Sequence, residues 1–256
     1  MLLDYEGYIF DLDGTIYVDD TVIPDAARTI NGLISSGKKV IFISNKTTGT
    51  SKDYYNFLRK NGFNINAEDI ITSADVICEY LSVNYKKEKF FAIGEKKIIS
   101  QITEAGLVYS ENPQEIKIVI VTLDRKLNYS KLEIAAKALE KGAKFYAANI
   151  DDTCPVEDGE ILDAGSTISA LEKRTHKKLL KHFGKPSENM LEFVKNKITI
   201  PLNRCLIIGD RLETDITMGN VFGIDTALVN TGVKNVFNSK SKIKPTYRIN
   251  SVADLY

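Results

Sequence analysis

The chain contains little cysteine and little histidine. Its 256 residues include three cysteines and two histidines. The cysteines, Cys78, Cys154 and Cys205, are widely spaced without a Cys-x-x-Cys pair, so the sequence indicates neither a disulfide framework nor a zinc site. We expect each to be a small packed side chain. The histidines, His176 and His182, lie in a lysine-rich stretch typical of a solvated helix face, so no catalytic histidine is expected.

The chain also lacks net charge and long hydrophobic runs. Thirty-four basic side chains balance thirty-four acidic ones, so no overall field draws the protein to nucleic acid or an anionic membrane. Any anion must therefore be bound locally. No apolar run approaches the roughly 20 residues that span a bilayer, and residues 1–7 contain two acids instead of a basic, apolar signal. We expect a cytoplasmic protein.

Strand-like and helix-like patterns alternate along the whole sequence. Strands are expected at residues 8–10, 39–43, 89–93, 118–121, 145–148, 205–208 and 226–229. Helices are expected from Pro24 to Gly37 and at residues 51–60, 95–105 and 130–141. Such alternation predicts βαβ units and a parallel sheet, and therefore an α/β protein.

Two carboxylates, Asp11 and Asp13, directly follow the first predicted strand. The carboxyl ends of parallel strands are where ligands bind in open α/β sheets. Asp11 can act there as a nucleophile that takes a phosphoryl group, while Asp13 protonates the leaving oxygen and later activates water. Gly14 permits an unusual backbone conformation, and Thr15 can hydrogen-bond into the loop.

The same motif is compatible in composition with a calcium loop and with a plain acidic turn. A calcium loop of the EF-hand type is excluded, because its glycine and glutamate positions hold Ile16 and Val22. A plain acidic turn after a strand stays open on this motif alone.

Two further segments offer groups that bind phosphate. Ser44 and Asn45 end the second predicted strand, where a hydroxyl and backbone N–H groups can hold phosphate oxygens, although an ordinary turn has the same composition. Lys185 lies in a Gly-Lys-Pro-Ser segment and can offset the charge of Asp11 and phosphate; a surface lysine at a helix entry is the alternative. A P-loop is excluded, because Leu179 and Pro186 occupy its glycine and hydroxyl positions.

A third strand delivers acids to the same edge. Asp210 follows the strand at residues 205–208 and can join Asp11 as a magnesium ligand, since oxygen ligands without histidine or cysteine suit a hard cation. Asp215 lies at or near a helix start and can orient Lys185 or a metal-bound water, or cap the helix.

Taken in order, the motifs Asp-x-Asp-Gly-Thr, Ser-Asn, Lys-Pro and Gly-Asp-x-x-x-x-Asp resemble the haloacid dehalogenase-like (HAD) superfamily of phosphohydrolases. About thirty residues separate Asp13 from Ser44, too few for a cap domain, whereas about one hundred and forty separate Asn45 from Lys185. That spacing resembles the NagD-like, or nitrophenylphosphatase-like, branch with a large α/β cap. Further matches lie at residues 92–95, 148–151 with Pro155, 209–216 and 231–232.

The resemblance implies a Rossmann-like, doubly wound parallel-sheet core at residues 1–79 and 183–256, with an inserted α/β cap domain at residues 80–182. It also implies a role for each core motif. Asp11 is the nucleophile and a metal ligand, and Asp13 is the general acid and base whose backbone carbonyl also binds magnesium. The remaining roles fall to Ser44 and Asn45 as the phosphate cradle, Lys185 as the charge clamp, and Asp210 as a metal ligand with Asp215 beside it.

In the cap, Asn149 and Asp151 match a segment that in relatives faces the active site and helps close it over substrate. The sequence departs from the family pattern at two places. Lys46 stands where relatives commonly have a second asparagine, and residues 162–165 replace a loop that usually contains Pro-Gly. Both departures bear on substrate choice and not on the reaction.

The expected function is magnesium-dependent hydrolysis of small phosphomonoesters through an aspartyl-phosphate intermediate. A phosphomutase shares every core motif, and a non-catalytic phosphate-ligand binding protein is the alternative from another class. A dehalogenase fits less well, because Asp13 and the metal site would have no purpose. The substrate stays open among sugar phosphates, nucleotides, glycerol phosphate, phosphoglycolate and nitrophenyl phosphate. The resemblance suggests a homodimer through the cap.

Overall fold

The computed structural model describes residues 4–156, 159–233 and 242–255. The chain divides into two compact units. Unit 1 contains Met1–Ser44, Ser51–Ile71 and Lys185–Tyr256, and unit 2 contains Asn45–Thr50 and Thr72–Gly184. Two of the crossing points from one unit to the other are therefore the peptide bonds Ser44–Asn45 and Gly184–Lys185, inside the two segments expected to bind phosphate.

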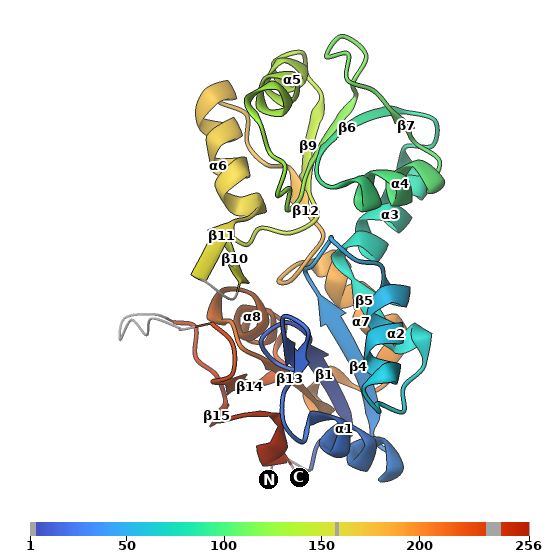
Figure 1. The fold of residues 1–256 in the computed structure, drawn as a ribbon, viewed down its shortest axis with the longest axis vertical. Coiled ribbons are helices and arrows are strands. Elements are labelled where there is room, and N and C mark those ends of the chain that lie inside the picture. Colours follow the sequence, from blue (N-terminus) through green and yellow to red (C-terminus); the bar gives the residue numbers. More distant parts are fainter. Residues whose placement is uncertain (1–3, 157–158, 234–241, 256) are drawn as a thin grey trace. The chain divides into compact units, whose positions relative to one another are not determined.

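Unit 1 is built on a six-stranded sheet in the order β15-β14-β13-β1-β4-β5 (Figure 1). Its strands are β1 (Gly7–Asp11), β4 (Lys39–Ser44), β5 (Ile70–Thr72), β13 (Cys205–Gly209), β14 (Asp225–Val229) and β15 (Tyr247–Ile249). β1 pairs in parallel with β4 and β13, and β14 pairs in parallel with β13 and β15. The carboxyl ends of β1, β4 and β13 therefore meet at one edge.

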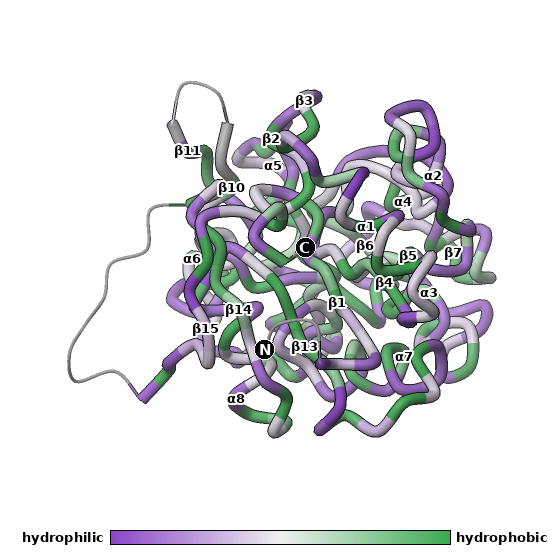
Figure 2. The backbone as a smooth tube through the Cα atoms, turned by 90° about the horizontal axis from the view of Figure 1, so that it is seen from below, coloured by the Kyte–Doolittle hydropathy of each residue, from purple (hydrophilic) through white to green (hydrophobic). Residues whose placement is uncertain are grey.

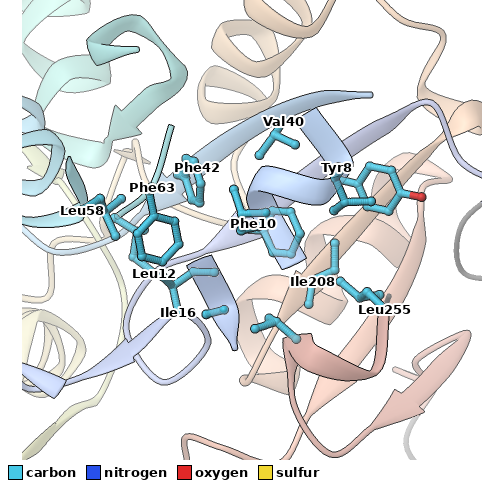
Figure 3. Packing of buried hydrophobic residues seen from close by; sticks show 14 of the residues in the cluster. Tyr8, Phe10, Leu12, Ile16, Val40, Phe42, Leu58, Phe63, Ile208 and Leu255 are labelled. Carbon is cyan, nitrogen blue, oxygen red and sulfur yellow. The ribbon is translucent and has the colours of Figure 1, made fainter. Parts of the chain in front are cut away.

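The central strand β1 is buried along its whole length, as expected for a parallel strand covered on both faces. Tyr8, Phe10 and Leu12 enter one core cluster, where Phe10 lies beside its register partners Phe42 and Ile208 (Figure 3). Figure 2 shows hydrophobic residues along β1 and β13, as expected for strands that are buried in the core. The rigid core thus fixes the strand ends that carry the acidic motifs.

Helices and short elements complete unit 1. They are α1 (Ala26–Ser35), α2 (Ser51–Lys60), α7 (Glu188–Ile198), α8 (Thr217–Phe222), the two-residue strands β2 (Tyr17–Val18) and β3 (Thr21–Val22), and single turns at Ala67–Asp69, Leu202–Arg204, Leu212–Ile216 and Val252–Leu255. α1 places Ile30 and Leu33 in the same core cluster as Phe10, because residues three apart lie on one helix face.

Unit 2 has its own parallel sheet of five strands, ordered β12-β9-β8-β6-β7. The strands are β6 (Lys89–Ile93), β7 (Val108–Tyr109), β8 (Ile118–Val121), β9 (Lys144–Ala147) and β12 (Lys181–His182), with a separate hairpin of β10 (Thr153–Val156) and β11 (Gly159–Leu162). In Figure 1, α5 (Tyr129–Glu140) and α6 (Ala164–Thr175) cover one face, and α3 (Ser73–Asn84) and α4 (Lys96–Glu104) cover the other. Alternate residues such as Phe91, Val119 and Phe145 pack toward α5 and α6.

The α/β fold is as the sequence predicted, and the strands at residues 89–93 and 118–121 have the predicted bounds. The three cysteines, all within the described residues, form no disulfide, and Cys205 is buried. Among the described residues, no helix has the length and apolar character needed to span a bilayer.

The predicted helix face around the histidines is wrong. α6 ends at Thr175, and His176 follows in the left-handed conformation with φ of 57°. His182 lies on β12, where it pairs with Ala147 of β9. A two-residue strand at a sheet edge is too short to produce a hydrophobic periodicity, so the lysines on either side dominated the pattern.

Candidate active site

Asp11 is the last residue of β1, and its carboxylate is buried at the carboxyl edge of the unit 1 sheet. Its Oδ1 accepts a hydrogen bond from Nζ of Lys185, which also donates to Oδ1 of Asp215 at 2.6 Å. Lys185 is 2% exposed, so its ammonium group has exchanged water for two carboxylates. Residues separated by 174 and 30 positions in the chain are thereby brought together.

The helix entry places Lys185. The lysine directly precedes Pro186 and Ser187, and Ser187 caps α7 by accepting a hydrogen bond from the backbone N–H of Met190 at 3.1 Å. An N-cap of this kind satisfies a backbone donor that the helix itself leaves unpaired. The burial of Lys185 excludes the surface lysine that the sequence left open.

Asp210 and Asp215 follow β13 and are held by backbone donors. Oδ2 of Asp210 accepts the N–H of Val233 at 2.8 Å, and Oδ2 of Asp215 accepts the N–H of Arg211 at 3.2 Å. A Cβ on Gly209 would lie 2.2 Å from Cγ of Asp215, so only glycine fits beneath that carboxylate. The turn after β13 therefore aims two acids with little freedom.

The main chain closes tightly around Asp210. A Cβ on Gly14 would lie 2.4 Å from Oδ2 of Asp210, and one on Gly232 would lie 1.9 Å from the same atom. Gly14 also has a φ of +80°, which side chains rarely adopt. Thr231 joins the two segments by donating from Oγ1 to the carbonyl oxygen of Gly14 at 2.5 Å. The glycine of the first motif is therefore required twice, for conformation and for space.

Asp11, Asp210 and Asp215 form a cluster that fits a divalent cation. One ligand oxygen from each lies within 4.8 Å of the others, and all three residues are buried. Oδ2 of Asp11 is buried without a hydrogen-bond partner among the described residues. The three buried carboxylates concentrate negative charge beside the ammonium of Lys185, and a hard divalent cation with oxygen ligands would balance that charge.

The pKa values reflect this crowding. Burial raises the pKa of Asp11 well above its usual range, and Asp215 and Asp210 add to the effect while Lys185 opposes it. Burial, and then Asp215, raises the pKa of Asp210 to about 6. Burial alone would lower the pKa of Lys185, but the two carboxylates bonded to it hold that pKa above its usual value, so the lysine stays charged.

Asp13 lies outside the three-carboxylate cluster and is only partly buried. Its Oδ2 accepts a hydrogen bond from the hydroxyl of Tyr17 at 3.3 Å. Burial raises the pKa of the Tyr17 hydroxyl, and the charge of Asp13, which accepts its hydrogen bond, raises it further. The sequence reasoning did not identify Tyr17, because no short motif marks a residue four positions after the acid.

The hydroxyl residues of the predicted site occupy different environments. Ser44 ends β4 and is buried at the same sheet edge as Asp11. Thr15 is fully buried, but its Oγ1 has no hydrogen-bond partner among the described residues, so the predicted bond into the loop does not form. Asn45, the next residue after Ser44, belongs to unit 2.

Within unit 2, four of its residues form one hydrogen-bonded cluster. Nδ2 of Asn45 donates to Oδ2 of Asp151 at 2.9 Å, and Nδ2 of Asn149 donates to the same oxygen at 3.0 Å. Asn149 also donates to Oδ1 of Asp163 at 3.2 Å. The structure thus joins the predicted residues Asn45, Asn149 and Asp151, and adds Asp163. The segment at residues 162–165, where the sequence departs from the family pattern, runs from the last residue of β11 through Asp163, the N-cap, into the start of α6.

The chain was compared with known proteins. The haloacid dehalogenase-like hydrolase model matches residues 8–108, and a HAD hydrolase-like model matches residues 182–255. Sugar-phosphatase AraL of Bacillus subtilis is 31% identical over 249 residues, which cover 97% of this chain and 91% of AraL. The chain belongs to the haloacid dehalogenase-like hydrolases. The expected family is thereby confirmed.

Solved structures of this hydrolase family agree. The 4-nitrophenylphosphatase of Thermotoga maritima superposes with a TM-score of 0.90 at 28% identity, covering 100% of this chain and 98% of that chain. A structure assigned to the NagD proteins superposes with a TM-score of 0.88 at 27% identity, covering 99% and 98%. The NagD-like branch, the HAD fold and the assignment as a phosphatase enzyme are therefore confirmed.

The charge balance of the acidic cluster generates a stability prediction. Asp210→Asn removes one of three like charges and keeps an acceptor for the N–H of Val233, so we expect a higher thermal midpoint than wild type in EDTA. In excess magnesium, wild type should gain stability, about 2.7 kcal/mol at a hundred times the dissociation constant, and the variant should gain far less. Thermal unfolding of both proteins in the two buffers tests this; equal gains from magnesium would contradict it.

Proposed function

We propose that this HAD phosphatase hydrolyses small phosphomonoesters through a phosphoryl group held on Asp11. The state of the Asp11 carboxylate carries the proposal. Oδ1 accepts a hydrogen bond from the Lys185 ammonium. Oδ2 is buried without a hydrogen-bond partner among the described residues, at the sheet edge where ligands bind. A carboxylate that is oriented through one oxygen and desolvated at the other is prepared to attack phosphorus.

In the first step a carboxylate oxygen of Asp11 bonds to phosphorus, and the bond from phosphorus to the ester oxygen breaks. Asp13 gives its proton to that departing oxygen, so the alcohol leaves uncharged. In the second step Asp13 takes a proton from water, whose oxygen bonds to phosphorus as the acyl-phosphate bond breaks. Inorganic phosphate leaves, and both acids return to their starting states.

Positive charge must offset the approach of an anionic ester to an anionic nucleophile. Lys185 supplies one positive charge, because the two carboxylates bonded to it hold the pKa of its ammonium above the usual value. Ser44 and Asn45 are proposed to hold the phosphate oxygens. We assign the cation to magnesium, held by Asp11, Asp210 and the backbone carbonyl of Asp13 with Asp215 beside it. When bound, the ion neutralises charge on the transferring group as a Lewis acid.

Unit 2 is proposed to be the cap domain, with the boundaries at residues 80 and 182 expected from the family pattern, and Asn149 and Asp151 are proposed to act on substrate. The names of the sugar phosphatase and nitrophenylphosphatase relatives support small phosphorylated substrates. A cytoplasmic location, a homodimer through the cap and the absence of nucleic-acid or membrane partners stay predictions.

Asp11→Asn should abolish turnover and leave the fold intact, because the amide keeps the shape of the side chain but is a poor nucleophile. The measurement is phosphate release from a panel of phosphomonoesters, including nitrophenyl phosphate, with magnesium and with EDTA. Asp69→Asn is the matched control. Asp69 is also a buried acid, its Oδ1 lies 2.8 Å from Nζ of Lys39, and it is not a member of this cluster. Substantial turnover by Asp11→Asn would refute the nucleophile assignment.

Asp13→Asn should lower kcat/KM for alkyl phosphates by about 10²- to 10⁴-fold, the usual contribution of general acid–base catalysis. Nitrophenolate leaves without protonation, so its kcat/KM should fall much less. Steady-state kinetics on the two ester types measures the difference. Equal losses would count against Asp13 as the acid.

A further inference from the structure

The hydroxyl of Tyr17 lies beside the carboxylate that the proposed mechanism uses for proton transfer. Its Oη donates to Oδ2 of Asp13 at 3.3 Å, and the residue as a whole is only 2% exposed. This distance is longer than the typical 2.7–2.8 Å of an O–H···O bond, but catalytic hydrogen bonds are often long before substrate binds. A buried hydroxyl aimed at one oxygen of an acid is a specific arrangement.

The backbone holds Tyr17 firmly in this position. It is the first residue of the β2–β3 hairpin, where it pairs with Val22, and its carbonyl accepts the N–H of Gly14 at 2.7 Å. Alternation along the strand turns Tyr17 inward and leaves Val18 41% exposed. The turn from Asp13 to Tyr17 is therefore closed at both ends by backbone contacts.

The ring is fixed separately from the hydroxyl. It packs edge-on against Phe57 of α2, with ring centroids 5.1 Å apart at an angle of 73°. Phenylalanine at position 17 would keep this packing, so the fold alone does not require the hydroxyl. The hydroxyl provides a donor to Asp13, which phenylalanine would lack.

We propose that Tyr17 is a positioning residue for Asp13, which fixes the rotation of its carboxyl group for proton transfer to and from the substrate. A donor at Oδ2 directs the exchanged proton to Oδ1, so both transfers use one defined oxygen. The inference rests on the proposed function, because it gives Tyr17 a purpose only if Asp13 is the acid and base. Tyr17 itself exchanges no proton with the substrate.

The experiment is a double-mutant cycle of Tyr17→Phe and Asp13→Asn, measured as kcat and KM on two substrates. These are nitrophenyl phosphate and the alkyl phosphate with the highest kcat/KM in the panel. Tyr8→Phe is the matched control, since it removes the hydroxyl of a fully buried tyrosine that stacks on Phe10 in the core. Thermal unfolding of every variant checks that the fold is retained.

We expect Tyr17→Phe to lower kcat/KM for the alkyl phosphate roughly 10- to 100-fold, the range for a hydrogen bond to a charged group. KM should change less than about two-fold, and kcat/KM for nitrophenyl phosphate should fall much less, because only the alkoxide needs its proton. In the Asp13→Asn background, Tyr17→Phe should have no further effect. Tyr8→Phe should leave both substrates unaffected.

Two results would overturn the inference while leaving the proposed function standing. In one, Asp13→Asn lowers kcat/KM more for the alkyl phosphate than for nitrophenyl phosphate, whereas Tyr17→Phe does not. The other is a Tyr17→Phe loss that is equal on both substrates or unchanged in the Asp13→Asn background, which would mean a structural role. If Asp13→Asn itself lacks the leaving-group dependence, the acid role fails first and the inference fails with it.

Discussion

The pairing of Lys185 with Asp11 and Asp215 is the interaction on which the candidate active site depends. Removing charges from water costs several kcal/mol per ion, and the cost is recovered only when partners are close and well oriented. Here one ammonium contacts two carboxylates, and a ligand oxygen of a third buried acid, Asp210, lies within 4.8 Å of an oxygen of each. Three acids are thus crowded together in a buried place, which is a disadvantage for stability and an advantage for binding a cation.

The packing of the parallel sheet offsets the loss of stability that such a cluster causes. β1 and β13 are buried along their lengths. Residues 7–10 of β1 pair in register with residues 205–208 of β13, directly ahead of Asp11 and Asp210 in the sequence. Gly209 at the end of β13, and Gly14 and Gly232 beyond the strand ends, lack the Cβ atoms that would otherwise collide with Asp210 or Asp215. Core packing supplies the stability that the acidic edge gives up, as is usual where a functional site breaks a local rule.

The sequence predicted seven strands of the two parallel sheets, the α/β class and the acids at the sheet edge, because those features depend on local periodicity and on where parallel strands end. The short strands β5, β7, β12 and β15 of the same sheets were missed. It also singled out Lys185, although only the structure shows that this lysine is buried. The link from Tyr17 to Asp13, the place of Asp163 in the unit 2 cluster and the strand at His182 were not predicted. Each depends on tertiary contacts, and the sequence patterns of the segments involved are too short or too common to predict such contacts.

The two acids of the first motif show how one short segment supplies two chemical roles. Leu12 between them enters the hydrophobic core, and this alternation turns Asp11 and Asp13 away from it. Asp11, still in the strand, is fully enclosed and bonded to a cation, as suits a nucleophile that must stay oriented. Asp13, one step beyond, is less enclosed and bonded to a neutral hydroxyl, as suits a group that must gain and lose a proton. The different roles proposed for these two like side chains follow from their surroundings, because a shift of two residues moves a carboxylate from an ion pair to the edge of solvent.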